Sequence, residues 1–208
     1  MKIFNQKTAI ETAKILLEIK AVKLSPSSPF TWASGMKSPI YCDNRKILSY
    51  PESRKTIKQY FADFVKTQYP DVDVIAGVAT GAIAVGALVA DLLDKPFIYI
   101  RSASKKHGLG NQIEGVLNEG ETVLVIEDLI STGMSSLDAV KAIRDKGNTV
   151  LGMLAIFTYG LPVAIENFKK ANCRIDVLSN FDTLISYALE TNYISESELK
   201  ILNDWKNL

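Results

Sequence analysis

Hydrophobic and polar positions change their spacing along this chain of 208 residues, and the spacing predicts which segments form helices and strands. Residues 5–21 carry apolar side chains near helical spacing, and residues 51–68 do the same after a proline that suits a first helical turn. From residue 72 onward, short runs that are apolar throughout alternate with longer segments of helical periodicity. Apolar strands separated by helices indicate a parallel sheet covered on both faces, so the pattern predicts an α/β fold.

The predicted elements of this alternating part follow one another closely. Strands are expected at residues 72–79, 96–101, 122–128, 148–159 and 173–179. Helices are expected at residues 81–94, 133–147, 161–172, 181–190 and 195–208, the last with a capping box of Ser195 and Glu198. Nearer the N-terminus, residues 30–44 are predicted to form two short strands joined by a turn at 34–37. Residues 102–115 are polar and glycine-rich, which predicts a long loop that is either functional or disordered.

Composition and charge narrow the function classes without identifying one. Apolar residues make up 47% of the chain and charged residues 23%, as in ordinary soluble proteins that form one well-packed domain. Lysine and arginine number 24 against 23 acids, so a net charge of +1 gives no global attraction to nucleic acid or a membrane surface. Cys42 and Cys173 fit neither a disulfide framework nor a zinc site. With no signal peptide or membrane-length apolar run, the chain is expected to be cytoplasmic.

The segment VLVIEDLISTGMSS, residues 123–136, carries an unusual set of polar residues. An apolar strand leads into two adjacent acids, Glu127 and Asp128, and small hydroxyl residues and Gly133 precede the next helix. Ligands of an open parallel sheet bind beyond the carboxyl ends of its strands, and a helix N-terminus there favours phosphate. Acids beside a phosphate can accept hydrogen bonds from sugar hydroxyls or hold Mg²⁺, so the segment predicts a ribose phosphate site. Ordinary helix caps are the alternative, although two adjacent like charges need compensation.

Two further segments carry candidate chemistry. GVATGAIAVG, residues 77–86, is a second strand-to-helix turn, where Thr80 and Gly81 would let backbone amides approach another anion. Helix packing alone also explains this composition. The predicted loop and the residue before it hold four basic side chains, Arg101, Lys105, Lys106 and His107. Such a loop could close over a polyanionic substrate, whereas a solvated surface loop is the alternative.

Three segments resemble those of one enzyme family. VLVIEDLISTGMSS resembles the phosphoribosyl-pyrophosphate (PRPP) motif of type I phosphoribosyltransferases. FTWASGMKSPIYCDNR, residues 30–45, resembles the N-terminal signature of orotate phosphoribosyltransferases, and IRSASKKHGLGNQIEG, residues 100–115, resembles their mobile catalytic loop. With the strand order, these segments cover most of the chain, so it is identified as a member of the orotate phosphoribosyltransferases.

The resemblance implies a fold and a reaction. The fold is a type I phosphoribosyltransferase-like core, a parallel sheet flanked by helices at about residues 50–180, within a single domain of residues 1–208. A small hood would come from about residues 1–48 and the C-terminal segment. The reaction transfers phosphoribosyl from PRPP to orotate with Mg²⁺, which gives orotidine 5′-monophosphate and pyrophosphate in de novo pyrimidine (UMP) synthesis. A homodimer with shared sites is implied, because the loop lysine of this family closes over the neighbouring subunit.

The resemblance also assigns roles to individual residues. The catalytic residues would be Lys105, Arg101, His107 and Asp128. PRPP would contact Arg101, Lys105, Lys106, His107, Thr80, Glu127, Asp128, Leu129, Ile130, Ser131, Thr132, Gly133, Met134 and Ser135. Orotate would contact Ser131 and the backbone of Tyr41 and Cys42. No protein residue is assigned as a direct metal ligand, and the resemblance does not separate the roles of the two acids.

The chain departs from the family pattern at several positions. Ala33 and Ser102 stand where many members carry a basic residue, and an arginine expected after the later strand to bind the orotate carboxylate is absent from FTYGLPVAIENF. Lys37 is a candidate for part of the missing charge, from its position alone. Two other functions stay open: a type I phosphoribosyltransferase for a purine base or uracil, and a non-catalytic PRPP-sensing regulator. The absence of a basic stripe argues against the regulator.

Overall fold

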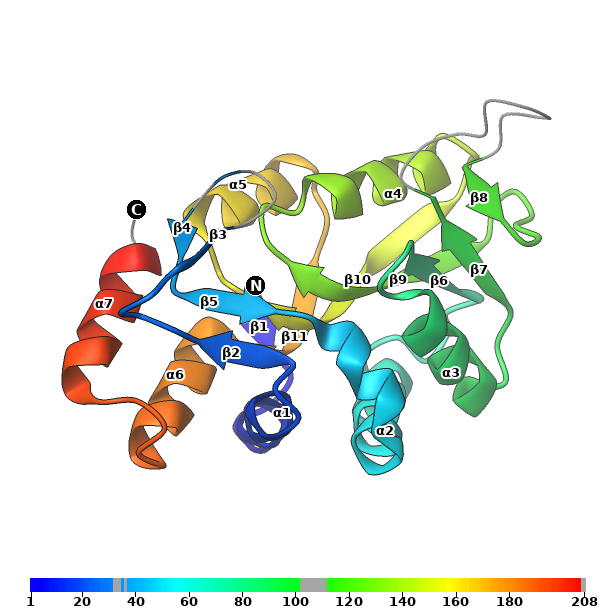
Figure 1. Cartoon of the computed structure of the whole chain (residues 1–208). Coiled ribbons are helices and arrows are strands. Elements are labelled where there is room, and N and C mark those ends of the chain that lie inside the picture. The colour runs from blue at the N-terminus through cyan, green and yellow to red at the C-terminus, as the bar shows by residue number, and fades with distance from the viewer. Residues whose placement is uncertain (32–34, 36, 102–111, 207–208) are drawn as a thin grey trace.

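The computed structural model of the chain describes residues 1–31, 35, 37–101 and 112–206. Its centre is a seven-stranded sheet in the order β1-β11-β10-β9-β6-β7-β8 (Figure 1). The strands are β1 (Lys2–Ile3), β6 (Val74–Val78), β7 (Phe97–Ile100), β8 (Ile113–Glu114), β9 (Thr122–Ile130), β10 (Thr149–Thr158) and β11 (Ile175–Asn180). Neighbouring strands are parallel except β7 and β8, which are antiparallel. The predicted parallel sheet is therefore confirmed, with one antiparallel strand at its edge.

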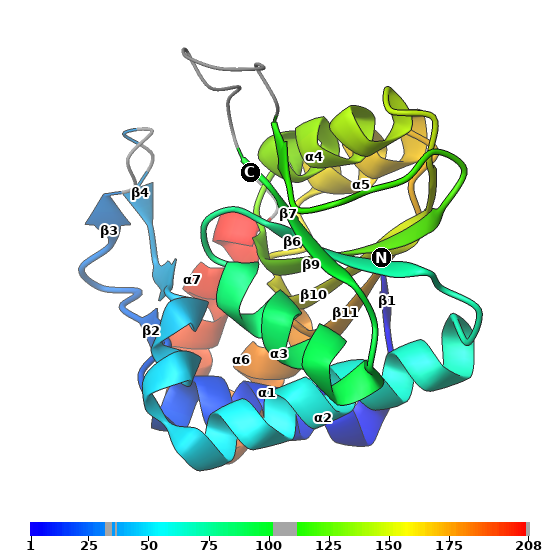
Figure 2. The same ribbon diagram turned by 90° about the vertical axis from the view of Figure 1, so that its right-hand side faces the viewer.

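Helices cover both faces of this sheet (Figures 1 and 2). One face carries α1 (Gln6–Glu18), α2 (Pro51–Gln68), α3 (Ile83–Leu93), α6 (Phe181–Glu190) and α7 (Glu196–Lys206). The other face carries α4 (Met134–Arg144) and α5 (Pro162–Lys170). Each helix buries apolar side chains in one of the two core clusters, which is why helical periodicity in the sequence located these segments.

The N-terminal segment forms two small antiparallel pairs beside the main sheet. β2 (Val22–Leu24) pairs with β5 (Ile40–Cys42), and β3 (Phe30–Thr31) pairs with β4 (Lys37–Ser38). The prediction of two strands at residues 30–44 is confirmed for the β3–β4 pair but needs correction beyond it, because Ile40–Cys42 form a separate strand that pairs with β2. Lys37, predicted to lie in the turn, belongs to β4, and residues 34 and 36 of that turn lie outside the described residues. The β3–β4 pair projects from the molecule in Figure 2. A short 3₁₀ helix, η1 (Asn44–Ser49), then leads into α2. The division into a hood and a core stays a prediction.

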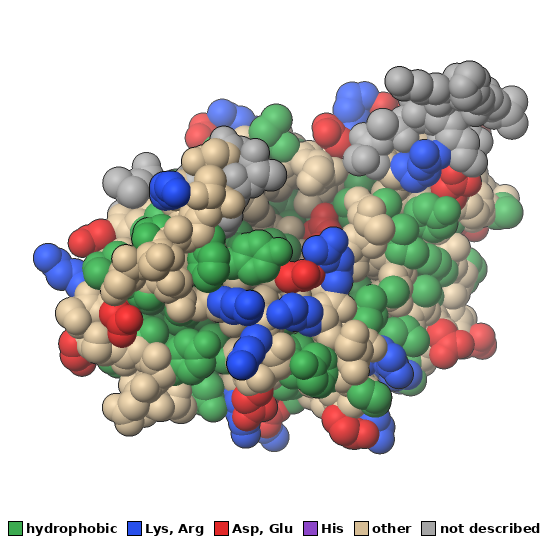
Figure 3. Space-filling view, viewed as in Figure 1, with side chains coloured by type: hydrophobic (Ala, Val, Ile, Leu, Met, Phe, Trp, Pro, Cys, Tyr) green, Lys and Arg blue, Asp and Glu red, His purple; other side chains and the backbone are tan. Residues whose placement is uncertain are grey.

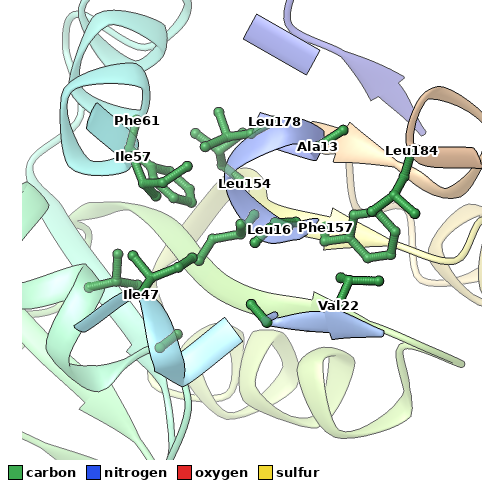
Figure 4. Close-up of a cluster of buried hydrophobic side chains, with 14 of the residues drawn as sticks. Ala13, Leu16, Val22, Ile47, Ile57, Phe61, Leu154, Phe157, Leu178 and Leu184 are labelled. Carbon is green, nitrogen blue, oxygen red and sulfur yellow. The ribbon is translucent and has the colours of Figure 1, made fainter. Parts of the chain in front are cut away.

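The larger core cluster holds the N-terminal segment against the sheet (Figure 4). Leu16 of α1 lies in this cluster with Phe157 of β10 and Leu184 of α6, all fully buried. Val22 of β2 and Ile47 of η1 join the same cluster. Burial of each such side chain contributes about 1.5–3 kcal/mol, so β2 and η1 are fixed relative to the strands behind them.

Two sequence predictions need correction. The loop predicted at residues 102–115 is wrong at its end, because Ile113 and Glu114 form β8 along the free edge of β7. The strand predicted to end at the two acids is also wrong, because β9 continues through Leu129 and Ile130. β10 offers both residues a partner, in the pairs Leu129↔Phe157 and Thr158↔Ile130, so pairing continues past the acids on that side.

Among the described residues, no helix has the length and apolar character needed to cross a membrane.

Candidate active site

The carboxyl ends of β6 and β9 bring the two predicted anion-binding turns together. β9 pairs with β6 only as far as Ile126↔Gly77, and its next two residues are the acids. Beyond that point, the turn after β6 approaches Asp128 so closely that a Cβ atom built on Gly81 would lie 2.3 Å from Asp128 Oδ2. A side chain at position 81 would therefore displace the Asp128 carboxylate, and glycine allows the turn and the acid to lie this close.

Glu127 and Asp128 occupy different environments although they are adjacent. The Glu127 side chain is 5% exposed, and its Oε1 accepts from the Asp128 backbone N–H (3.0 Å) and its Oε2 from Ser136 Oγ (2.7 Å). Burial raises the pKa of Glu127 well above its ordinary value, and the neighbouring Asp128 charge raises the pKa further. Asp128 is only half-buried and lies against the turn at Gly81. Of the two acids, Asp128 is therefore the one placed to meet a ligand.

The turn from β9 into α4 is held in shape by α5. Gly133 has φ +78°, and a Cβ atom at this position would lie 2.5 Å from Cε2 of Phe168. Asn167 Nδ2 donates to the backbone carbonyl of Thr132 (3.0 Å). The first backbone N–H groups of α4 have no acceptor within the helix, as at any helix N-terminus, and Met134 and Ser135 are exposed there. The turn therefore presents an exposed helix N-terminus where the sequence predicts one, and anion binding there stays a prediction.

The turn from β6 into α3 has a similar construction. The backbone N–H of Ala79 donates to the carbonyl of Ile100 (2.8 Å), which ties the turn to the end of β7. The peptide between Ala79 and Thr80 is cis, and Thr80 is exposed. The helix begins at Ile83, two residues later than expected. Thr80 thus lies at the same edge of the sheet as Asp128, as the sequence predicts for two anion sites.

Arg101 marks the start of the predicted catalytic loop. Its backbone N–H donates to Gln112 O (2.9 Å), and Gln112 Nε2 donates to Arg101 O (2.8 Å). The guanidinium lies 3.5 Å from Glu114 Oε1, in a partly exposed and therefore weak ion pair. The ends of the loop are thus held together beside β7. Lys105, Lys106 and His107, like Ser102, lie outside the described residues.

The N-terminal segment reaches the acids through η1, a contact that the sequence did not reveal. Asn44, which is 2% exposed, donates from Nδ2 to the backbone carbonyl of Asp128 (2.6 Å). The Cys42 thiol donates to Asn44 Oδ1 (3.2 Å), and burial and then the Asp128 charge raise the pKa of Cys42. Tyr41, next to Cys42, is exposed. Asn44 therefore links Cys42, a predicted orotate contact, to Asp128, a predicted ribose contact.

Tyr159, at the end of β10, is another residue of this region that was not predicted. Its side chain is buried, and burial followed by the charges of Cys42 and Tyr41 raises the pKa of its hydroxyl. The ring contacts Trp205 of α7 at 5.9 Å between centroids. The residue appears in the sequence only as one more aromatic at the end of an apolar run, so nothing separated it from ordinary core positions.

Positive charge gathers beside the site in spite of the balanced composition. Figure 3 shows Lys and Arg side chains around an acidic one in the middle of the face formed by β2, β5 and η1. In this region Arg45 Nε lies 2.7 Å from Asp43 Oδ1, and Lys46 Nζ donates to Lys20 O (3.0 Å). Lys37 lies on the β3–β4 hairpin, where its Nζ donates to Thr31 Oγ1 (2.7 Å). Ala33 lies outside the described residues.

The donor set at this edge limits how a metal could bind. Among the described residues, no group of three or more His, Cys, Asp or Glu side chains could hold a metal ion. Asp128 offers one accessible carboxylate, which fits Mg²⁺ because this ion is often bound through one or two carboxylates together with substrate phosphates and water.

A cavity of about 620 Å³ lies elsewhere, at the start of β1 and β11, with Lys2, Arg174 and Asp176 in its wall.

Comparisons with known proteins show which proteins this chain is similar to. A family model described as "Phosphoribosyl transferase domain" matches residues 43–177. Orotate phosphoribosyltransferase of Porphyromonas gingivalis is 55% identical over 194 residues, which cover 93% of this chain and 92% of the relative. The enzyme of the same name from Enterococcus faecalis is 54% identical over 200 residues, 96% of this chain and 95% of the relative. The crystal structure of orotate phosphoribosyltransferase from Aeropyrum pernix has a TM-score of 0.74 at 27% identity, covering 88% of this chain and 99% of that one.

Proposed function

Because the chain belongs to the orotate phosphoribosyltransferases, within the phosphoribosyl transferase domain family, we propose that the site at the ends of β6 and β9 performs their reaction. PRPP and orotate are converted there to orotidine 5′-monophosphate and pyrophosphate, a step of pyrimidine synthesis. The observation that supports this site most directly is the contact between Asp128 and the turn at Gly81, which unites a sugar-binding acid with a phosphate-binding turn.

The two acids have different roles in this proposal. Both oxygens of Glu127 already accept hydrogen bonds from within the protein, from Asp128 N–H and Ser136 Oγ. Glu127 therefore supports the strand end, and Asp128 receives the ribose hydroxyls. Bound Mg²⁺ supplies charge neutralisation of the pyrophosphate, and the Asp128 carboxylate is the described group that would hold it.

Two turns and a loop hold the phosphates. The 5′-phosphate binds at the N-terminus of α4, to backbone N–H groups and hydroxyls of residues 131–135. The backbone of Ala79 to Gly81 receives the pyrophosphate. Arg101 lies beside β7, where it would neutralise this leaving group. Its 3.5 Å contact with Glu114 would then be replaced by a contact with phosphate. Lys105, Lys106 and His107 are proposed to add cations from the loop.

This arrangement suits the chemistry of the reaction. Departure of pyrophosphate from the anomeric carbon leaves an oxocarbenium-like centre, while negative charge builds on the leaving oxygens. Preorganised cations and N–H groups directed at that charge lower the barrier. Orotate, already an anion, attacks the anomeric carbon without a general base, so no acid–base pair is needed. Ser131 and the backbone of Tyr41 and Cys42 would hold orotate on the other side of the ribose.

Assembly and location are part of the same proposal. A homodimer with shared sites would place the loop of one subunit over the acids of its partner. A cytoplasmic location is consistent with Cys42 and Cys173, which are both free thiols.

Loss of orotate absorbance in the ultraviolet, with PRPP and Mg²⁺ present, tests the proposed function. We expect turnover that requires both PRPP and the metal, together with release of one pyrophosphate per orotate consumed. Adenine, guanine and uracil serve as competing acceptors in matched reactions. Turnover of one of these bases in place of orotate would assign the chain to another type I phosphoribosyltransferase activity. Binding of PRPP with no transfer to any base would favour a sensing role.

A further inference from the structure

We propose that Asn44 is a positioning residue of the transfer reaction, which fixes Asp128 and ties the orotate-binding segment to it. This inference rests on the proposed function, because it assigns Asp128 to ribose and Tyr41–Cys42 to orotate. Asn44 itself would touch neither substrate. Its effect would pass through the main chain of Asp128 on one side and through Cys42 on the other.

The contact is short and partly buried, and it lies just beyond the end of the pairing between β9 and β6. Asn44 Nδ2 lies 2.6 Å from the carbonyl oxygen of Asp128, and the Asn44 side chain is 2% exposed. The pairing of β9 with β6 ends at Ile126, two residues before this carbonyl. The amide of Asn44 thus supplies a donor to the β9 main chain just past the last residue paired with β6. Loss of this donor would leave the Asp128 carbonyl without its hydrogen bond from η1.

Asp128 is consequently held at two points. Its main-chain carbonyl is bound by Asn44, and its carboxylate lies against the turn at Gly81, where a Cβ atom would come within 2.3 Å. A residue constrained at its main chain and at its carboxylate retains few orientations, which is the preorganisation that a ribose or metal contact requires. Release of the carbonyl end would let the acid shift while Gly81 still blocks it on the other side.

The other half of the Asn44 amide faces the orotate segment. Cys42 Sγ donates to Asn44 Oδ1 at 3.2 Å, so one side chain receives a bond from the orotate segment and gives one to the ribose acid. Because Ile47 of the same 3₁₀ helix is buried in the core cluster, η1 is a firm base for this link. Asn44 therefore connects the sites of the two substrates by a continuous chain of hydrogen bonds.

Asn148 provides a matched control elsewhere in the molecule. It is also buried, at 6% exposure, and its amide also makes one bond in each direction: Oδ1 accepts from Glu121 N (3.0 Å) and Nδ2 donates to Lys146 O (3.2 Å). It precedes β10 at the amino end of the sheet, opposite the site. Asn148→Ala thus removes a buried amide of the same kind without touching Asp128 or Cys42.

The test compares steady-state kinetics of Asn44→Ala, Asn44→Asp and Asn148→Ala in the full-length protein. For Asn44→Ala we expect KM to rise for both substrates and kcat/KM for PRPP to fall about tenfold or more. Asn44→Asp keeps the shape and the acceptor for Cys42 but removes the donor, so it should show at least the same loss. Asn148→Ala should lower the melting temperature similarly and keep both KM values within about twofold of wild type.

Several outcomes would overturn the inference. Kinetics of Asn44→Ala that match those of Asn148→Ala would reduce Asn44 to a structural residue, as would full activity of Asn44→Asp. If Asn44→Ala does not fold, Asn44→Asp, which removes the donor but keeps the shape of the side chain, takes its place and the same KM comparison decides. Wild-type protein that fails to use orotate would refute the proposed function instead, and this result is obtained before any variant is measured.

Discussion

Glu127 and Asp128 are neighbours in the sequence, but the fold separates their electrostatic roles. Glu127 is buried with two internal hydrogen bonds, whereas Asp128 is half-buried against the turn at Gly81. Burial and the neighbouring Asp128 charge disfavour ionisation of Glu127 and raise its pKa, and the hydrogen bonds that Glu127 accepts from Ser136 and the Asp128 N–H offset part of this effect. This explains how the end of β9 tolerates two adjacent acids, a feature that the sequence alone could not account for.

Substitution of Glu127 by glutamine should make stability less dependent on pH. The folded-state pKa of Glu127 is raised, so the folded state holds a proton that the unfolded state releases as pH rises above its ordinary carboxyl value of 4.5. Its contribution to stability is therefore greatest below that pH and falls as pH rises toward the raised pKa. Glu127→Gln removes this fall and should be more stable than wild type at pH 7 and similar to it near pH 4. Each 1 kcal/mol of difference would appear as a shift of about 2–4 °C in Tm for a domain of this size.

Thermal or urea unfolding between pH 4 and pH 8 measures this dependence. Glu198→Gln is a control for which the expected pH dependence of stability has the opposite sign, because the backbone N–H of Ser195 lowers the pKa of Glu198. Loss of the Glu198 carboxylate should lower the free energy of unfolding at neutral pH and leave it unchanged at low pH. A difference between Glu127→Gln and wild type that stays constant over the whole pH range would contradict the assignment.

At the scale of elements, periodicity predicted most of the fold, and long-range contacts account for what it missed. α2 was predicted with its observed bounds, Pro51–Gln68, because its proline start and apolar stripe are both local signals. β8 has two residues and depends on the free edge of β7, so no local pattern marks it. The acid pair and both anion-binding turns were found from strand-end and helix-start residues. Asn44 was not, because its bond to Asp128 joins positions 84 residues apart.

The turn between β9 and α4 depends on its glycine for two reasons that substitution can separate. Gly133→Ala places a non-glycine residue at φ +78° and also drives a Cβ atom into the Phe168 ring. Gly120→Ala has only the backbone cost, because Gly120 has φ +87° and no atom lies within 4 Å of its Cβ position. The backbone term costs on the order of 1 kcal/mol at each site, and Gly133→Ala should lose a further ~1 kcal/mol or more from overpacking.

Kinetics should distinguish the same two variants. We expect Gly133→Ala to raise KM for PRPP, because the displaced turn carries the proposed 5′-phosphate contacts, and Gly120→Ala to leave this value unchanged. Urea unfolding supplies the stability comparison and initial rates at varied PRPP supply the kinetic one. Equal losses of stability in the two variants would show that Phe168 yields without cost and that its ring does not constrain the turn.

At the scale of the whole molecule, the chain concentrates charge locally while its net charge stays at +1. Asp128, the two anion-binding turns and Arg101 all belong to one edge of the sheet, and Tyr41 to Asn44 reach the same edge from the N-terminal segment. The β7–β8 pairing holds the two ends of the proposed catalytic loop together beside this edge. A loop anchored in this way can serve its own subunit or a neighbour, so the homodimer proposal makes a separate prediction.

Mixing two inactive variants distinguishes these arrangements. If the site of each subunit combines its own Asp128 with Lys105 of the partner, a heterodimer of Asp128→Asn and Lys105→Ala contains one site with both residues intact and one with both lost. Random exchange at equal concentrations makes half of the dimers mixed, so activity should recover to about a quarter of wild type in a closed two-fold dimer. Lys105→Ala mixed with His107→Ala is the matched control, because both defects lie in the loop and every mixed site keeps one of them. Native mass spectrometry of differently tagged chains verifies that subunits exchange. Exchange without recovery in the first mixture, or equal recovery in both, would exclude sites shared in this way.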